Sequence, residues 1–275
     1  MRMSFGFSAP SSPPEELHPE LWRAHQLGGA ARAVRPTGFG LLDGQLPGGG
    51  WPCGVLTELL LAAPGVGEMR LLAPVMAVPR QDDTQTLSDG RSVMLFGPPA
   101  APCAQALQQM GVDLDRLIVV HGREGVAGAS VRHLLTPADL LWALEQALRS
   151  GQVGVVLAWL PERLAAGALR RLQLAAQAHE GPAFMLRGMG ERCKPSPAPL
   201  RLALHPGRGP DEIAVQVLKR RGPAAGPPVR LSLPPVLPAA ARRRWSSASP
   251  ASTPPVHRPS ATVLALEASL APPSG

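Results

Sequence analysis

The stretch VLTELLLAAPGVGEMRLLAPVMAV, residues 55–78, decides the fold class of this chain. An almost unbroken apolar run over 55–61 predicts a strand that is buried on both faces. Residues 62–68 predict a tight glycine-containing loop, and RLLAPVMAV over 70–78 predicts a buried helix. A strand, a glycine loop and a helix in this order are typical of a parallel α/β sheet, which binds ligands beyond the carboxyl ends of its strands.

The same alternation continues along the chain. Further buried strands are predicted over 92–96, 117–121, 153–161 and 183–187, and the helices between them over 101–111, 136–150 and 162–179. Two alternating segments, 200–204 and 213–219, flank a Gly/Pro turn and predict an antiparallel hairpin. We therefore expect an α/β fold in which helices cover both faces of a mostly parallel sheet.

Composition shifts divide the 275 residues into three parts. The α/β domain is expected over 15–233, between a disordered N-terminus over 1–14 and a Pro/Ser/Ala-rich, disordered tail over 234–275. The domain opens with EELHPELWRAHQ, residues 15–26, which predicts a short amphipathic helix with Leu17, Leu21 and Trp22 on one side. We expect Trp22, Trp51 and Trp142 to be packing residues.

Signals for export, membranes and metals are missing from this sequence. It has no apolar signal segment and no run long enough to span a bilayer, and its three cysteines lie far apart. We therefore expect a cytoplasmic protein without a membrane partner, a disulfide framework or a metal site.

The positive charge is concentrated in the last third of the chain. Residues 1–186 have a net charge of −2, whereas residues 187–275 have a net charge of +9. Such asymmetry favours nucleic acid or an acidic partner. Since 25 of the 27 basic residues are arginine, codon bias explains the same pattern equally well.

The loop over 62–70 lacks the residues that phosphate chemistry needs. A loop of the type GxxxxGK[ST] uses backbone amides and a lysine to hold phosphates, and a hydroxyl to bind Mg²⁺. Here Gly65 lies within the loop and Gly67 matches the second glycine, but Glu68 and Met69 stand in the lysine and hydroxyl positions. Trp159 ends the strand where an acidic metal ligand belongs. We predict a degenerate phosphate loop without cofactor or catalysis; an ATPase with a substituted pocket is the alternative.

Several motifs together resemble the ImuA family, whose members are RecA-like accessory proteins of bacterial mutagenic translesion synthesis and are also described as SulA-like. The resemblance covers about residues 15–233. The motifs are LHPELWR at 17–23, TGF at 37–39, LPGGGWP at 46–52, TEL at 57–59, MGVDLDRL at 110–117, AWLP at 158–161 and VLKRRG at 217–222.

The resemblance implies a RecA-like, P-loop-type core and a role in the DNA-damage response. The implied partners are an ImuB-type protein, an alternative polymerase and RecA, with single-stranded DNA as a further candidate. By the family description, inhibition of cell division is another possible role.

Two basic clusters are candidate contact sites. In RecA-like proteins the residues matching Lys219 and Arg221, beside Arg220, point toward a neighbouring subunit's nucleotide; a solvated strand end is the alternative. The loop before the hairpin contacts DNA in RecA, which makes Arg187, Arg192 and Lys194 candidates, although the loop has no aromatic residue for base stacking. Arg163, Arg170 and Gln177 are expected on one solvated face of the helix over 162–179.

Overall fold

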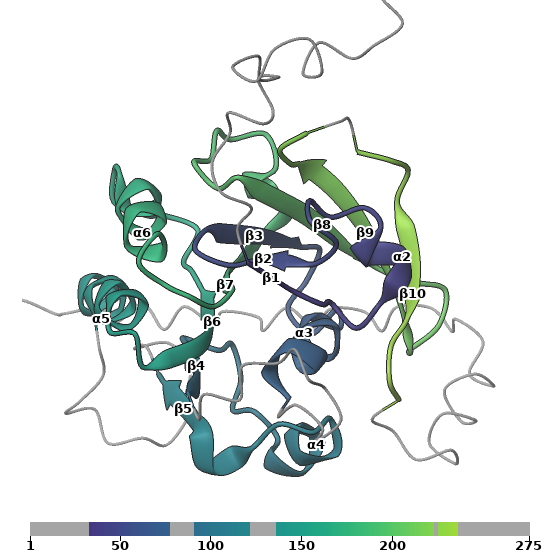
Figure 1. The fold of residues 1–275 in the computed structure, drawn as a ribbon, viewed down its shortest axis with the longest axis horizontal. Helices are drawn as coiled ribbons and strands as arrows, with labels where there is room; N and C mark the ends of the chain where they lie inside the picture. The colour runs from purple at the N-terminus through teal and green to yellow at the C-terminus, as the bar shows by residue number, and fades with distance from the viewer. Residues whose placement is uncertain (1–32, 78–90, 122–135, 223–224, 236–275) are drawn as a thin grey trace, which may run out of the picture. The chain divides into compact units, whose positions relative to one another are not determined.

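A computed structural model describes residues 33–77, 91–121, 136–222 and 225–235. The expected disordered N-terminus, the helix over 15–26 and the tail beyond residue 235 lie outside the described residues. Figure 1 shows the chain alternating between strands and helices. The elements are β1 (Val34–Arg35), α2 (Gly40–Asp43), β2 (Trp51–Pro52), β3 (Leu56–Leu61), α3 (Glu68–Met76), β4 (Ser92–Phe96), α4 (Ala104–Gln109), η1 (Leu114–Arg116), β5 (Leu117–Val120), α5 (Pro137–Arg149), β6 (Val153–Trp159), α6 (Ala168–Ala176), β7 (Ala183–Gly188), η3 (Met189–Glu191), β8 (Leu200–Pro206), β9 (Glu212–Lys219) and β10 (Val229–Ser232).

An eight-stranded sheet forms the centre of the fold, with the strand order β10-β9-β8-β3-β7-β6-β4-β5. The six strands from β8 to β5 are parallel, and β9 and β10 extend one edge by antiparallel pairing. This arrangement confirms the predicted α/β class, the mostly parallel sheet and the hairpin. Strand β10 was not predicted, because its four residues lie within a proline-rich stretch.

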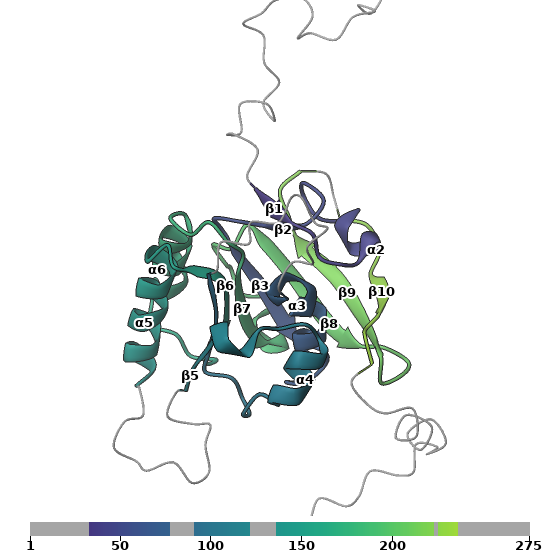
Figure 2. The same cartoon turned by 60° about the horizontal axis from the view of Figure 1, so that its bottom comes forward.

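Helices pack on both faces of the sheet (Figure 2). α3 and α4 bury Leu71, Leu72 and Leu107 in one apolar cluster with the side chains of β3, β7 and β8 that point to that face. α5 and α6 bury Leu144 and Leu172 in a second cluster on the opposite face. β3 is buried at all six positions, as its continuous apolar run predicts.

Local sequence signals explain where α5 begins and why α6 is short. The Thr136 hydroxyl accepts a hydrogen bond from the Asp139 amide, and the Asp139 carboxylate accepts one from the Thr136 amide, so the predicted start of α5 is a capping box. The helix predicted over 162–179 covers only Ala168–Ala176. Gly167 has a φ of 76°, a left-handed conformation that a continuous helix cannot contain.

Of the tryptophans predicted to be packing residues, the structure describes two, Trp51 and Trp142, and only Trp51 is buried. Trp51 is fully buried, and its ring meets Phe184 edge to face with 5.0 Å between the ring centroids. Trp142 is 65% exposed on α5, so its prediction as a packing residue was wrong. The helical period explains the difference, because Trp142 lies opposite the buried Leu140, Leu141 and Leu144. Within the described residues no helix has the length and apolar character needed to cross a membrane.

Candidate functional site

The loop between β3 and α3 binds a carboxylate of its own chain. The backbone amide of Gly65 donates to Oε1 of Glu68 at 2.8 Å, and the amide of Gly67 donates to Oε2 at 3.1 Å. Gly67 has a φ of 118°, which glycine adopts without strain, and this conformation turns the chain directly into α3. Glu68 is 2% exposed. The loop therefore forms an anion cradle, and the Glu68 carboxylate occupies it.

The outer side of this loop is covered as well. A Cβ atom on Gly67 would lie 2.7 Å from Cδ1 of Leu233 and 3.7 Å from Cδ1 of Ile213, so these side chains pack directly over the glycine. Leu233 is buried, and its amide donates to the carbonyl of Asp211 at 2.7 Å. Leu233, in the segment after β10, therefore covers the outer side of the cradle at Gly67.

Arg70 is the nearest cation on α3, and it is already engaged. Its guanidinium contacts a carboxylate oxygen of Asp211 at 2.8 Å and the carbonyl of Pro210 at 2.6 Å. These contacts tie α3 to the turn between β8 and β9. A phosphate at the loop would have to compete with them for the arginine.

The other two substituted positions are occupied by apolar packing. Met69 and Trp159 are half-buried, and both pack against the apolar cluster beneath α3. No group of three potential metal-ligating side chains occurs anywhere in the described ranges. Met69 and Trp159 therefore pack against the same apolar cluster, although β7 lies between β3 and β6 in the sheet.

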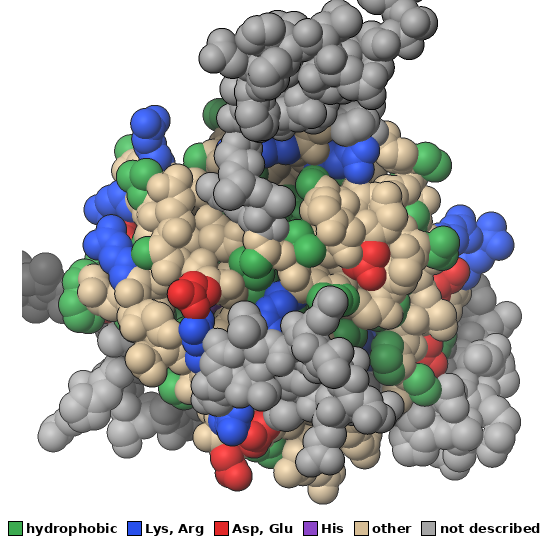
Figure 3. All heavy atoms as spheres, viewed as in Figure 1, with side chains coloured by type: hydrophobic (Ala, Val, Ile, Leu, Met, Phe, Trp, Pro, Cys, Tyr) green, Lys and Arg blue, Asp and Glu red, His purple; other side chains and the backbone are tan. Residues whose placement is uncertain are grey.

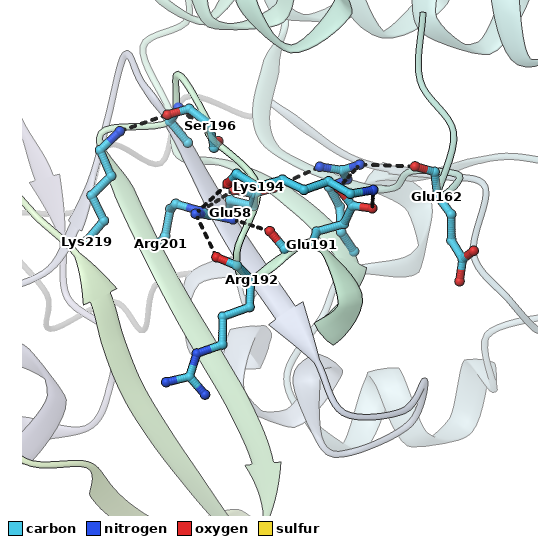
Figure 4. A network of polar contacts seen from close by, with 10 residues as sticks. Glu58, Glu162, Glu191, Arg192, Lys194, Ser196, Arg201 and Lys219 are labelled. Carbon is cyan, nitrogen blue, oxygen red and sulfur yellow. Dashed lines mark hydrogen bonds and ion pairs between the residues drawn. The ribbon is translucent and has the colours of Figure 1, made fainter.

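A buried ion network lies on the opposite face of β3 and was not predicted (Figure 4). Glu58 of β3 is 1% exposed and contacts two arginines: Nε of Arg201 at 2.5 Å and Nη1 of Arg187 at 3.3 Å. Arg187 also contacts Glu191 at 2.9 Å, and Glu191 contacts Lys194 at 2.7 Å. Each buried charge therefore has a partner, which a low-dielectric site requires.

This network holds the loop between β7 and β8 in one conformation. Arg201 donates to the carbonyls of Glu191 at 2.9 Å, Lys194 at 3.2 Å and Arg192 at 3.4 Å. The hydrogen bond from Lys194, together with the charge of Arg187, holds the pKa of Glu191 below its usual range. The alternating pattern in LRLAL over 200–204 contained a signal for this site, since an arginine on an inner strand position requires a buried acid.

The predicted DNA-contact residues have different environments. Arg187 is buried in the network and cannot contact DNA at the surface, so the predicted DNA contact is wrong for this residue. Arg192 is exposed at the loop surface and donates to the Gln216 side chain at 3.3 Å, and the Lys194 side chain is 62% exposed. A DNA contact by Arg192 and Lys194 stays a prediction.

The basic strand end lies far from the anion cradle. In the β8–β9 pair, Pro206 is opposite Ile213 near the cradle, whereas Arg201 is opposite Lys219 at the other end of β9. Lys219 is exposed and donates to the Ser196 carbonyl at 2.8 Å, and Arg220 donates to the Gln45 carbonyl. Arg221 is exposed. The two predicted sites therefore lie at opposite ends of the strands.

Comparison with known proteins gives one partial match. No curated protein matches the sequence. The family model described as "Cell division inhibitor SulA" matches residues 85–184, which is less than half of the chain. The matched part runs from β4 to the beginning of β7 and includes neither the anion cradle nor the basic strand end. Over these residues, the chain is similar to the SulA family.

Proposed function

We propose that this chain is a non-catalytic, RecA-like accessory protein in the response to DNA damage. The observation that carries the proposal is the Glu68 carboxylate, which accepts the loop amides that would otherwise hold a phosphate. A bound nucleotide would place further negative charge beside this buried carboxylate. The fold therefore serves to present surfaces to partners rather than to hydrolyse ATP.

The resemblance to ImuA gives the proposal its biological setting. An adaptor in mutagenic translesion synthesis would join an ImuB-type protein and its polymerase to RecA on damaged DNA. The similarity to the SulA family over 85–184 supports a relation to the SOS response. In this proposal Lys219 and Arg221 contact a partner's nucleotide face, and the exposed Arg192 and Lys194 contact single-stranded DNA.

Two assays test the two parts of this proposal. Purified protein should show no magnesium-dependent ATP hydrolysis above background, with or without single-stranded DNA. Turnover that disappears in a Gly67→Asp variant would establish the alternative, a DNA-dependent ATPase. Co-sedimentation with ATP-loaded RecA filaments should fall at least tenfold on replacing Lys219 and Arg221 with alanine, because charge-assisted contacts to phosphate contribute roughly 1.5–3 kcal/mol each. Equal sedimentation of both proteins would reject this contact.

Inhibition of cell division is a second candidate, and the family match favours it. Expression of the chain in undamaged cells distinguishes the two roles. Filamentous growth would support division inhibition, whereas recovery of a mutagenic polymerase with the tagged protein from damaged cells would support the adaptor role.

A further inference from the structure

The outward side of α5 and α6 exposes two large apolar side chains. Trp142 of α5 is 65% exposed and Leu174 of α6 is 55% exposed, although the inner sides of both helices are fully packed. Tryptophan is seldom this exposed, and at surfaces it is among the residues that contribute most to binding. We therefore expect the surface around Trp142 and Leu174 to bind a partner.

The same side is basic. Arg149, Arg170 and Arg171 are exposed on it, and Arg171 joins the two helices through Glu145 of α5 at 2.9 Å. Among the residues that the structure describes, no ion pair is found for Arg149 or Arg170. Figure 3 shows Lys and Arg side chains along the side of the molecule that α6 and α5 form. We call this surface the α5–α6 face; it comprises Trp142, Arg149, Arg170, Arg171 and Leu174.

The described chain begins near the residues that follow α6. The Ala33 carbonyl accepts a hydrogen bond from Cys53 at 2.9 Å, and a Cβ atom on the adjacent Gly54 would lie 3.5 Å from the His179 carbonyl, just beyond α6. The Leu56 amide donates to the Gln173 side chain on α6 at 3.1 Å. Ala33, the first described residue, therefore lies near the C-terminal end of α6.

The preceding sequence complements the face in both charge and polarity. Residues 15–22, EELHPELW, contain three glutamates and three large apolar side chains. The ten residues from 23 to 32 can span up to about 33 Å when extended. The seven-residue step from Trp142 to Arg149 along α5 covers only about 10 Å. The linker is therefore about three times as long as this stretch of the face when it is extended.

We infer that residues 15–22 dock on the α5–α6 face of their own chain. Leu17, Leu21 and Trp22 pack against Trp142 and Leu174, while the glutamates contact Arg149 and Arg170. A short tether gives an effective concentration in the millimolar range, so a weak intrinsic affinity is sufficient to keep the face covered.

Hydroxyl-radical footprinting of the full-length protein tests this inference, with oxidation of Trp142 as the readout. Replacing Glu15, Glu16 and Glu20 with lysine should raise the Trp142 oxidation rate about threefold or more, because attraction becomes repulsion. Adding Arg149→Glu and Arg170→Glu should restore the protection, since the charges are then exchanged. Arg208→Glu with Arg230→Glu is the matched control and should not restore it. Buried Trp51 reports whether each variant is folded.

Three results would overturn the inference. The first is an equal oxidation rate of Trp142 in the wild type and the triple lysine variant. The second is restoration by the control pair as well as by the pair on the face. The third is protection that disappears on dilution, which would show that the segment comes from a second copy of the chain.

Discussion

Removal of the Glu68 carboxylate should convert the filled cradle into an anion-binding site. In Glu68→Ala the amides of Gly65 and Gly67 lose their acceptors, which lie at 2.8 and 3.1 Å. Hydrogen bonds to a charged acceptor contribute roughly 1.5–3 kcal/mol each, and the longer bond belongs at the lower end. We therefore expect the free energy of unfolding to fall by about 3 kcal/mol in a buffer without multivalent anions.

Sulfate or inorganic phosphate should recover part of this loss in the variant. If the vacated cradle binds sulfate with a Kd of about 1 mM, 10 mM sulfate stabilises the folded state by about 1.4 kcal/mol. For a domain of this size, that corresponds to a rise in Tm of roughly 3–6 °C. Thermal unfolding is followed in sulfate and chloride series at constant ionic strength.

The matched control is Glu212→Ala. Glu212 also accepts a backbone hydrogen bond, from the Arg208 amide at 2.6 Å, but it is the half-buried first residue of β9 and accepts no hydrogen bond from the loop amides of the cradle. Its removal changes the net charge by the same amount, so any general effect of sulfate on a more positive protein appears in both variants. The cradle would be refuted by equal sulfate responses in wild type, Glu68→Ala and Glu212→Ala.

Three further predictions concern stability. Arg201→Met leaves the buried Glu58 with a single arginine and removes the donor of three loop carbonyls, so chemical denaturation should show that the free energy of unfolding falls by about 3–5 kcal/mol. The exposed Arg230→Met should change it little, and a loss below 1 kcal/mol in Arg201→Met would contradict the network. Burial, with a smaller contribution from Arg91, lowers the pKa of His179 to about 4, so the free energy of unfolding should fall by about 3 kcal/mol as the pH falls from 6.5 to 4. Urea titrations should show this pH dependence in the wild type and in His205→Gln, and a much weaker one in His179→Leu. Truncation after residue 235 should leave Tm nearly unchanged, whereas Leu233→Ala should lower the free energy of unfolding by about 2–4 kcal/mol, because Leu233 is buried over the cradle. A large fall in Tm from the truncation alone would show that the tail packs on the domain.

The sequence was most informative where one local rule dominates. The apolar runs of β3 and β6 predict buried parallel strands, and Thr136 with Asp139 predicts the start of α5. The failures have physical causes. Gly167 interrupts a helix that composition alone extends to residue 162, and β10 depends on pairing with β9 rather than on its own pattern.

The candidate site could be predicted in part. The sequence showed that Glu68 is the wrong residue for phosphate binding. It did not show that the Glu68 carboxylate accepts hydrogen bonds from the loop amides, because this depends on the loop conformation. The Glu58 network joins residues more than 120 positions apart, and the pairing of β3 with β7 and β8 brings them together. Without that strand order, Arg187 is indistinguishable from a surface arginine.

The position of β3 between β7 and β8 also has a consequence for the chain as it leaves the ribosome. Both partners of β3 are encoded more than 120 residues after it, whereas β4 and β5 are neighbours in sequence and in the sheet. At a synthesis rate of about 5–20 residues per second, β3 waits roughly 6–25 seconds for its first partner. During this interval a strand of six residues that is buried at every position in the finished sheet is exposed, which makes it a natural binding segment for a chaperone.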